Sequence, residues 1–168
     1  PALPGEKPTL SDWADHLTTI FPEVRIKKFM EMRGADGGPW RRLCALPALW
    51  VGLLYHAPSL AAAWDLCRDW TAEERATLRH DAAKHGLRAS IRGRSMRDLA
   101  RDVLAIAEEG LKARARPGSG GMVPDETHFL GALQEIVSSG QTPADELLAR
   151  YRGEWAGDLS RLYAEYSY

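Results

Sequence analysis

Only one segment of this 168-residue chain has the residue pattern of a β-strand. It is EVRIKKFMEMRG, residues 23–34, in which β-branched and charged residues first alternate, and this pattern predicts a strand from about Val24 to Met32. A strand leaves backbone N–H and C=O groups unpaired along its edges, so a single strand needs other strands beside it. We therefore expect its partner strands to lie outside this chain.

The rest of the chain is predicted to be helical. A short helix that begins after Ser11 precedes the strand, and the GADGG sequence at 34–38 predicts a loop after it. Thr71 followed by Glu74 forms the sequence of a capping box, and Ser95 is also a suitable N-cap. Apolar periodicity then predicts helices at about 40–55 (kinked or restarted at Pro47), 59–69 with Ser59 as its cap, 71–86, 96–115, 126–139 and 143–151, with a loop at 116–124 and an aromatic tail at 155–168.

Composition excludes several classes of protein. The 22 basic and 23 acidic residues nearly cancel, so bulk charge gives no support to nucleic-acid binding. Only Cys44 and Cys67 are cysteines, which excludes a disulfide-rich secreted scaffold. The longest apolar stretch, residues 43–57, is too short to span a membrane, and no secretory signal pattern is present. We expect a cytoplasmic protein with no membrane partner.

The strand and the loop after it contain the most chemically suggestive residues. Alternation along a strand places Glu31 and Arg33 on the same face. A carboxylate beside a guanidinium suits a site for Mg²⁺ and phosphate, because the carboxylate binds the metal and the arginine binds the phosphate. The alternative is an ordinary ion pair between strands, followed by a turn. The residues alone favour this second interpretation.

A resemblance to a known family alters that balance. The run from Pro8 to Tyr55 contains SDWADHLTT and EMRGADGGPW, and it closely resembles the plant-type glutamate–cysteine ligases of plants and proteobacteria. The similarity continues at DWTAEER, GLRASIRG and SSGQTPADELLARYRGEW, so it covers essentially residues 1–168. Such ligases are longer and the first residue is Pro1 rather than Met, so we expect this chain to be the C-terminal part of a single catalytic domain.

The resemblance implies a fold and a reaction. The fold is α+β: a mostly helical part of a glutamine-synthetase-like carboxylate–amine ligase, which contributes about one strand to an antiparallel active-site sheet. The reaction is the first step of glutathione biosynthesis, in which ATP phosphorylates the γ-carboxylate of glutamate and the amine of cysteine attacks the γ-glutamyl phosphate. ATP and Mg²⁺ are the implied cofactors, and glutamate, cysteine and ATP are the small-molecule partners. A plastid location is the alternative to the cytoplasm if the source is a plant.

The resemblance also implies roles for matched residues. Glu31 is expected to bind Mg²⁺, and Arg33 to be catalytic and to contact the transferred phosphate or the glutamyl group. Asp36, Trp40 and Arg41 are candidates for substrate binding. Asp36 has turn capping as its alternative role, Trp40 has core packing, and Arg41 has a plain surface charge. Most metal and nucleotide contacts are expected upstream of Pro1, so the chain alone is predicted to be inactive.

Other interpretations remain open at the level of sequence. Five arginines at 88–101 favour a solvated helix face over a loop that contacts phosphate or nucleotide. The five histidines show no metal-ligand spacing, and the two cysteines are not expected to form a disulfide. The functional alternatives are a related γ-glutamyl ligase of thiol metabolism and, in a different class, a non-catalytic helical interaction module.

Overall fold

The computed structural model describes residues 4–116 and 125–166, which divide into two compact units. The first unit comprises residues 1–36 and the second comprises residues 37–168. Most of the loop predicted at 116–124 lies outside the described residues. The described elements are mostly helical with small antiparallel sheets, which confirms the predicted α+β class.

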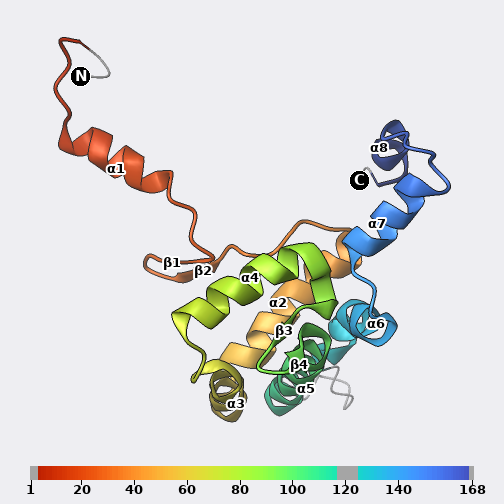
Figure 1. Cartoon of the computed structure of the whole chain (residues 1–168). Coiled ribbons are helices and arrows are strands. Elements are labelled where there is room, and N and C mark those ends of the chain that lie inside the picture. Colours follow the sequence, from red (N-terminus) through yellow and green to blue (C-terminus); the bar gives the residue numbers. More distant parts are fainter. Residues whose placement is uncertain (1–3, 117–124, 167–168) are drawn as a thin grey trace. The chain divides into compact units, whose positions relative to one another are not determined.

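The first unit consists of one helix and one hairpin (Figure 1). Helix α1 spans Leu10–Thr18 and is capped by Thr9, not by Ser11, because Asp12 completes a capping box with Thr9. Strands β1 (Val24–Ile26) and β2 (Met30–Met32) follow and pair in antiparallel fashion. The prediction of a single strand from Val24 to Met32 is therefore wrong, because the chain reverses at residues 27–29.

The pairing register of the hairpin preserves the two faces expected for a single strand. Val24 pairs with Met32 and Ile26 with Met30, while Arg25 pairs with Glu31. Residues directly opposite each other in a pair of strands share a face, so the even-numbered positions form an apolar face and the odd-numbered positions a charged one. Within the described residues, each strand pairs only with the other, so both outer edges of the hairpin carry unpaired backbone groups.

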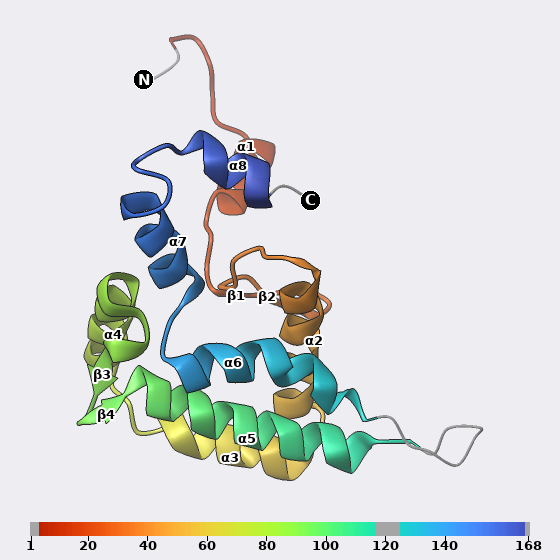
Figure 2. The same ribbon diagram turned by 90° about the vertical axis from the view of Figure 1, so that its right-hand side faces the viewer.

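The second unit is a helical assembly in which α2 crosses α5, while α3 and α6 lie beside α5 (Figure 2). The capping box at Thr71 and the cap at Ser95 are confirmed, and Gly140 ends α6 in the left-handed conformation. The helices are α2 (Trp40–Leu54), α3 (Ala57–Cys67), α4 (Ala72–His85), α5 (Met96–Arg114), α6 (Gly131–Ser139), α7 (Pro143–Arg152) and α8 (Ser160–Tyr166), with 3₁₀ turns at Gly86–Arg88 and Glu126–Leu130.

The crossing of α2 and α5 is a contact between backbones. A Cβ added at Gly52 would lie 2.2 Å from the carbonyl oxygen of Ala107, and one added at Gly110 would lie 1.8 Å from the oxygen of Gly52. Only glycine allows this approach. The main hydrophobic core surrounds the crossing: Ala48, Leu53, Leu104, Ala107, Leu111, Leu130 and Val137.

Helix α3 begins earlier than its predicted cap. His56 is the N-cap, with Pro58 in the first turn, so Ser59 is inside the helix. Ser59 is buried, and its hydroxyl donates to the carbonyl oxygen of Ile106 on α5 at 3.1 Å. Nδ1 of His56 lies 2.9 Å from the same hydroxyl oxygen. A polar side chain thus links α3 to α5 instead of capping α3.

A second hairpin lies in the connection between the helices predicted at 71–86 and 96–115, where no strand was predicted. Strands β3 (Ser90–Ile91) and β4 (Arg94–Ser95) pair across a loop of two residues, Arg92 and Gly93. Both loop residues have positive φ, 51° and 78°, as expected for the tight turn that suits two twisted strands. Two-residue strands leave almost no alternation to detect, so the Arg-Gly pair was the available sequence signal.

The predicted helix at about 40–55 is continuous through Pro47. Within residues 4–116 and 125–166, no single helix is long and apolar enough to cross a membrane. Helices α2 and α3 meet the length and composition criteria only as a pair, and that pair is bent by 94°. The described part of the aromatic tail is docked on α7 as expected: Nη1 of Arg150 in α7 donates to the hydroxyl oxygen of Tyr166 in α8 at 3.1 Å, and Trp155 is buried.

Replacement of Gly52 by alanine tests the backbone contact between α2 and α5. The new methyl group has to displace the backbone of α5, so we expect Gly52→Ala to reduce the free energy of unfolding by roughly 2–3 kcal/mol. Gly131→Ala in α6 is the matched control, because a Cβ there meets no atom within 4 Å. Alanine favours the helix, so this control should be neutral or stabilising by up to about 1 kcal/mol. Urea unfolding of both variants measures the difference, and equal stabilities would contradict the close approach.

Candidate functional site

The charged face of the β1–β2 hairpin brings Arg25, Glu31 and Arg33 together. Arg25 is opposite Glu31 in the register, and its Nε donates to Oε2 of Glu31 at 2.6 Å. Arg33 follows Glu31 by two residues, and its backbone N–H donates to the carbonyl oxygen of Glu23 at 2.8 Å. This bond extends the hairpin pairing by one pair, so the backbone fixes the guanidinium of Arg33 on the same face as Glu31.

Both arginines act on one oxygen of Glu31. Nη1 of Arg33 lies 3.6 Å from Oε2, the atom that Arg25 also contacts. The pKa of Glu31 is lowered, first by the hydrogen bond from Arg25 and further by the positive charges of Arg25, Arg33 and Lys27. The carboxylate is therefore ionised at neutral pH, and Oε1 remains available for a ligand.

Arg33 has an unused donor. Its Nη1 is buried and has no hydrogen-bond partner among the described residues, since the contact with Glu31 is longer than a hydrogen bond. The guanidinium lies over the ring of Phe21, 4.9 Å from its centroid, and 21% of the side chain is exposed. A buried donor without an acceptor is costly, so this position favours an incoming anion.

The donor set fits one part of a magnesium site. Mg²⁺ is commonly held by one or two carboxylates together with substrate phosphates. Glu31 offers one carboxylate oxygen, and Arg33 offers a donor to a phosphate beside it. The described residues contain no group of three or more His, Cys, Asp or Glu side chains that could hold a metal ion.

The three predicted substrate-binding residues are divided between the two units, Asp36 in the first and Trp40 and Arg41 in the second. Asp36 is exposed beyond the hairpin and forms no side-chain hydrogen bond within the described residues, so its predicted turn-capping alternative is not seen. Trp40 begins α2 in the second unit and is 77% exposed, so it does not pack in the core of the described residues. Arg41 is paired with Glu135 of α6 at 2.8 Å on the surface.

Arg25 is the contributor that sequence reasoning missed. In a single strand, Arg25 would lie on the same face as Glu31 but six positions away from it. The reversal at residues 27–29 makes them direct partners. Opposite charges at positions 25 and 31, on either side of a Lys-Lys-Phe turn, were the available signal.

The arginines at 88–101 each have a partner within the chain. Arg88 pairs with Asp145, Arg94 with Asp102, and Arg101 with Asp98. Arg97 donates to backbone oxygens near the end of α6, including that of Val137 at 2.7 Å. Arg88, Arg94 and Arg97 connect different elements of the fold, which does not favour a phosphate-binding loop. Arg101 pairs within α5 and is 59% exposed, as expected for a solvated helix face.

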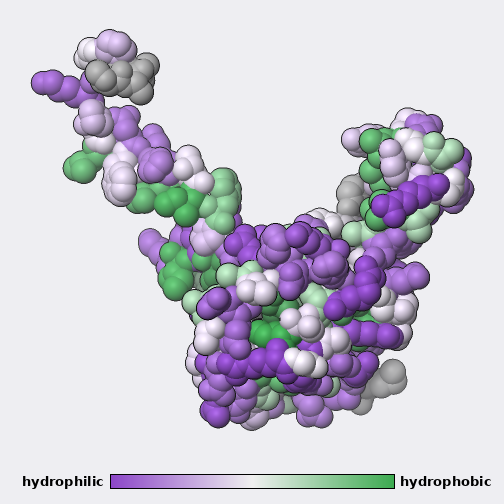
Figure 3. Space-filling model, viewed as in Figure 1, coloured by the Kyte–Doolittle hydropathy of each residue, from purple (hydrophilic) through white to green (hydrophobic). Residues whose placement is uncertain are grey.

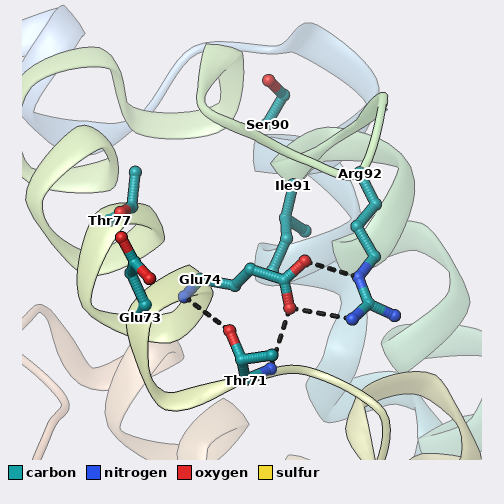
Figure 4. Close-up of a pocket in the computed structure, with 7 residues that line it drawn as sticks. All are labelled: Thr71, Glu73, Glu74, Thr77, Ser90, Ile91 and Arg92. Carbon is teal, nitrogen blue, oxygen red and sulfur yellow. Dashed lines mark hydrogen bonds and ion pairs between the residues drawn. The ribbon is translucent and has the colours of Figure 1, made fainter.

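A pocket of about 280 Å³ lies between the start of α4 and the β3–β4 hairpin (Figure 4). Arg92 spans its wall and donates to both carboxylate oxygens of Glu74, at 2.7 and 2.8 Å. These bonds, with the backbone N–H of Thr71, lower the pKa of Glu74 to about 2. The charged groups of Arg92 and Glu74 bind each other. The charged face of the β1–β2 hairpin is therefore the stronger candidate site.

Removal of the Arg25 charge tests the electrostatics of that face. We expect Arg25→Gln to raise the pKa of Glu31 towards its ordinary value of 4.5, because the strongest stabilisation of the carboxylate is lost. The pairing in the unsubstituted chain should weaken only as the pH falls through the lowered pKa of Glu31. Lys28→Gln removes the same charge from the turn and is the control. An NMR titration of the Glu31 carboxyl carbon measures both, and an unchanged pKa in Arg25→Gln would refute the pairing.

Comparison of the sequence with known proteins identifies the family of this chain. Residues 4–165 match glutamate-cysteine ligase family 2 (GCS2). The chain is 50% identical over 168 residues to the chloroplastic glutamate–cysteine ligase of Solanum lycopersicum, and 50% identical over 168 residues to that of Arabidopsis thaliana. The chloroplastic ligase of Medicago truncatula is 49% identical over 168 residues. All of this chain is covered in each case, but it spans only 31%, 31% and 32% of these relatives. The chain belongs to glutamate-cysteine ligase family 2.

Proposed function

We propose that this chain is part of a glutamate–cysteine ligase, an ATP-dependent carboxylate–amine ligase that joins the γ-carboxylate of glutamate to the amine of cysteine. The observation that carries the proposal is the family match over residues 4–165. In the reaction, an oxygen of the γ-carboxylate attacks the γ-phosphorus of ATP and ADP leaves. The amine nitrogen of cysteine then attacks the acyl carbon, loses a proton, and phosphate leaves with the C–O bond electrons.

Arg33 is proposed as the catalytic residue of this chain. Its buried Nη1 has no hydrogen-bond partner in the described residues, which suits a contact to the transferred phosphate or the glutamyl group. A fixed positive charge there offsets the negative charge that develops during phosphoryl transfer. The cation–π contact with Phe21 and the backbone bond to Glu23 hold Arg33 in place before substrate arrives.

Glu31 is proposed as a ligand of Mg²⁺ through Oε1, while Arg25 holds Oε2. Bound Mg²⁺ would neutralise phosphate charge and orient the γ-phosphate for transfer. Arg25 is a positioning residue in this scheme, because it touches Glu31 and not the reacting atoms. Asp36, Trp40 and Arg41 remain proposed substrate-binding residues, and the exposed ring of Trp40 is available for such contacts.

The proposal extends to the organisation and location of the enzyme. We propose that residues 1–168 are the C-terminal part of one catalytic domain, which is in keeping with relatives about three times as long. The cytoplasm and the plastid are the two candidate compartments. The relatives named above are chloroplastic, which supports the plastid.

A chimera offers a direct test of Glu31. The matching 168 residues of the tomato ligase are replaced by this chain, and ATP-dependent formation of γ-glutamylcysteine is measured. We expect Glu31→Gln to lower kcat by on the order of 100-fold, because a neutral amide is a poor Mg²⁺ ligand. Glu6→Gln, also in the first unit and exposed, should leave turnover unchanged. Equal turnover in the two variants would remove Glu31 from the site.

The chain by itself is predicted to be inactive. It supplies one metal ligand and one phosphate contact, whereas phosphoryl transfer needs several of each. Incubation of residues 1–168 with glutamate, cysteine, ATP and Mg²⁺ should therefore release no ADP above background. Release of ADP with formation of the dipeptide would overturn this prediction. A chimera that accepts another amine in place of cysteine would favour the related γ-glutamyl ligase, and a fully inactive, folded chimera would favour the non-catalytic module.

A further inference from the structure

Arg42 has a buried hydrogen-bond donor that no described residue accepts. It is the third residue of α2, and its Nε is buried without a hydrogen-bond partner. Within residues 4–116 and 125–166, its guanidinium also forms no ion pair and lies over no aromatic ring. A buried charged donor without an acceptor is costly, so such a group favours the binding of an anion.

The residues at the start of α2 do not neutralise this charge. Arg41 is the neighbour of Arg42 in sequence, but its own charge is paired with Glu135 of α6 at 2.8 Å. The first turn of α2 contains no acidic residue, and Pro39 provides no side-chain cap. The positive end of the helix dipole therefore adds to the charge of Arg42.

Arg42 differs in this respect from other arginines of the second unit. Figure 3 shows a largely hydrophilic surface on this unit. Many of its arginines pair with an acidic side chain at 3.3 Å or less: Arg68, Arg88, Arg92, Arg94 and Arg101. Trp50 of α2 also has a buried Nε1 without a partner, but its indole is neutral and packs against the main core. Arg42 combines a buried free donor with a charge that no described acid offsets.

Gly38 provides the space in which the side chain of Arg42 lies. A Cβ added at Gly38 would be 3.2 Å from Cβ and 3.3 Å from Cδ of Arg42, closer than carbon atoms normally pack. The hydrocarbon stem of Arg42 is therefore folded back against the loop before α2. At Gly37, an added Cβ would meet no atom within 4 Å. The absence of a side chain at Gly38 thus defines where the guanidinium of Arg42 can lie.

We propose that Arg42 binds the α-carboxylate of an amino-acid substrate of the ligase, glutamate or cysteine, through Nε–H and a neighbouring Nη–H. This inference rests on the proposed function. Nε and one Nη of a guanidinium present two parallel N–H groups, and the two oxygens of a carboxylate can accept both. One unpaired cation matches the single negative charge of a carboxylate, whereas a triphosphate is bound by several cationic groups and metal ions.

This contact differs in kind from those proposed for Glu31 and Arg33. The α-carboxylate takes no part in bond making, and its charge is the same in the bound substrate and in the transition state. An interaction of equal strength in both states contributes to KM and leaves kcat largely unchanged. Arg42 would therefore hold and select the substrate, while Glu31 and Arg33 act on the phosphate that is transferred.

Substitution of Arg42 in the tomato chimera tests the inference by kinetics. Arg42→Met keeps most of the hydrocarbon stem beside Gly38 and removes the guanidinium. We expect KM for glutamate or for cysteine to rise on the order of 100-fold, with kcat reduced less than about 10-fold and KM for ATP unchanged. Arg42→Lys keeps the charge without the paired donors and should raise the same KM about 10-fold. Arg101→Gln, an exposed arginine of α5, is the control and should change no constant.

The kinetic outcomes identify the substrate or overturn the inference. A selective rise in KM for glutamate assigns the contact to glutamate, and a selective rise for cysteine assigns it to cysteine. A rise for ATP alone would show that Arg42 binds phosphate, which overturns the inference. Unchanged KM values for both amino acids, or an equal rise for all three substrates, would overturn it as well.

The two adjacent glycines test how Arg42 is positioned. Gly38→Ala forces the stem of Arg42 to move, so it should raise the same KM that Arg42→Lys raises. Gly37→Ala is the matched control and should leave that KM unchanged, because its methyl group meets no neighbour. Equal KM values in the two alanine variants would contradict the placement of Arg42 by Gly38.

An NMR measurement in the unsubstituted chimera needs neither turnover nor a folded variant. The Hε–Nε signal of Arg42 is assigned by its absence from the spectrum of Arg42→Lys. With Mg²⁺ and a non-hydrolysable ATP analogue present, addition of glutamate or of cysteine should move the Hε signal downfield and slow its exchange with water. The inference is overturned if neither amino acid changes this signal, including the case in which the analogue alone changes it.

The same signal distinguishes failure of this inference from failure of the proposed function. A chimera without ligase activity in which an amino acid shifts the Arg42 signal supports the carboxylate contact and counts against the function. An active chimera in which neither amino acid shifts it supports the function and overturns the carboxylate contact.

Discussion

Cross-strand pairing in the β1–β2 hairpin determines what each residue of the first unit can do. Because Arg25 is opposite Glu31 and Ile26 is opposite Met30, charged and apolar side chains separate onto two faces. The charged face holds a carboxylate with one oxygen bound by arginine, and beside it a guanidinium nitrogen without a hydrogen-bond partner. The proposed chemistry depends on this register, because the register places Arg25, Glu31 and Arg33 on one face of the hairpin.

The second unit depends on a different constraint. Gly52 and Gly110 allow the backbones of α2 and α5 to touch, and the main core forms around that crossing. Arginine side chains then connect the surrounding elements, as in the bonds from Arg92 to Glu74 and from Arg97 to the end of α6. The second unit therefore has its own core, whereas α1 and the hairpin contain no buried residue.

Sequence patterns predicted much of the second unit, because long amphipathic helices leave a strong periodic signal. The caps at Thr71 and Ser95 were found for the same reason, since capping follows local side-chain chemistry. Ser59 was misassigned as a cap because its bond to Ile106 connects residues 47 positions apart, which local patterns do not reveal. The β3–β4 hairpin was missed because its strands are too short to alternate.

The candidate site was predicted in part. The predicted strand proved to be a hairpin, but its register pairs odd-numbered residues with odd-numbered residues. The prediction that Glu31 and Arg33 share one face is therefore correct. The contact between Arg25 and Glu31 could not be read from a single-strand pattern. The roles proposed for Glu31 and Arg33 come from the family resemblance, because an ion pair alone is compatible with a structural function.

The most direct test of the central claim is whether a divalent metal bound with ATP approaches Glu31. Mn²⁺ can replace Mg²⁺ and broadens NMR signals of nearby nuclei, so the carboxyl carbons of Glu31 and Glu6 can be compared in the tomato chimera. We predict that Mn²⁺ with ATP broadens the Glu31 signal beyond detection and leaves the Glu6 signal sharp. A Glu31 signal that stays sharp at saturating Mn²⁺ and ATP would contradict the assignment of this face as part of the ligase site.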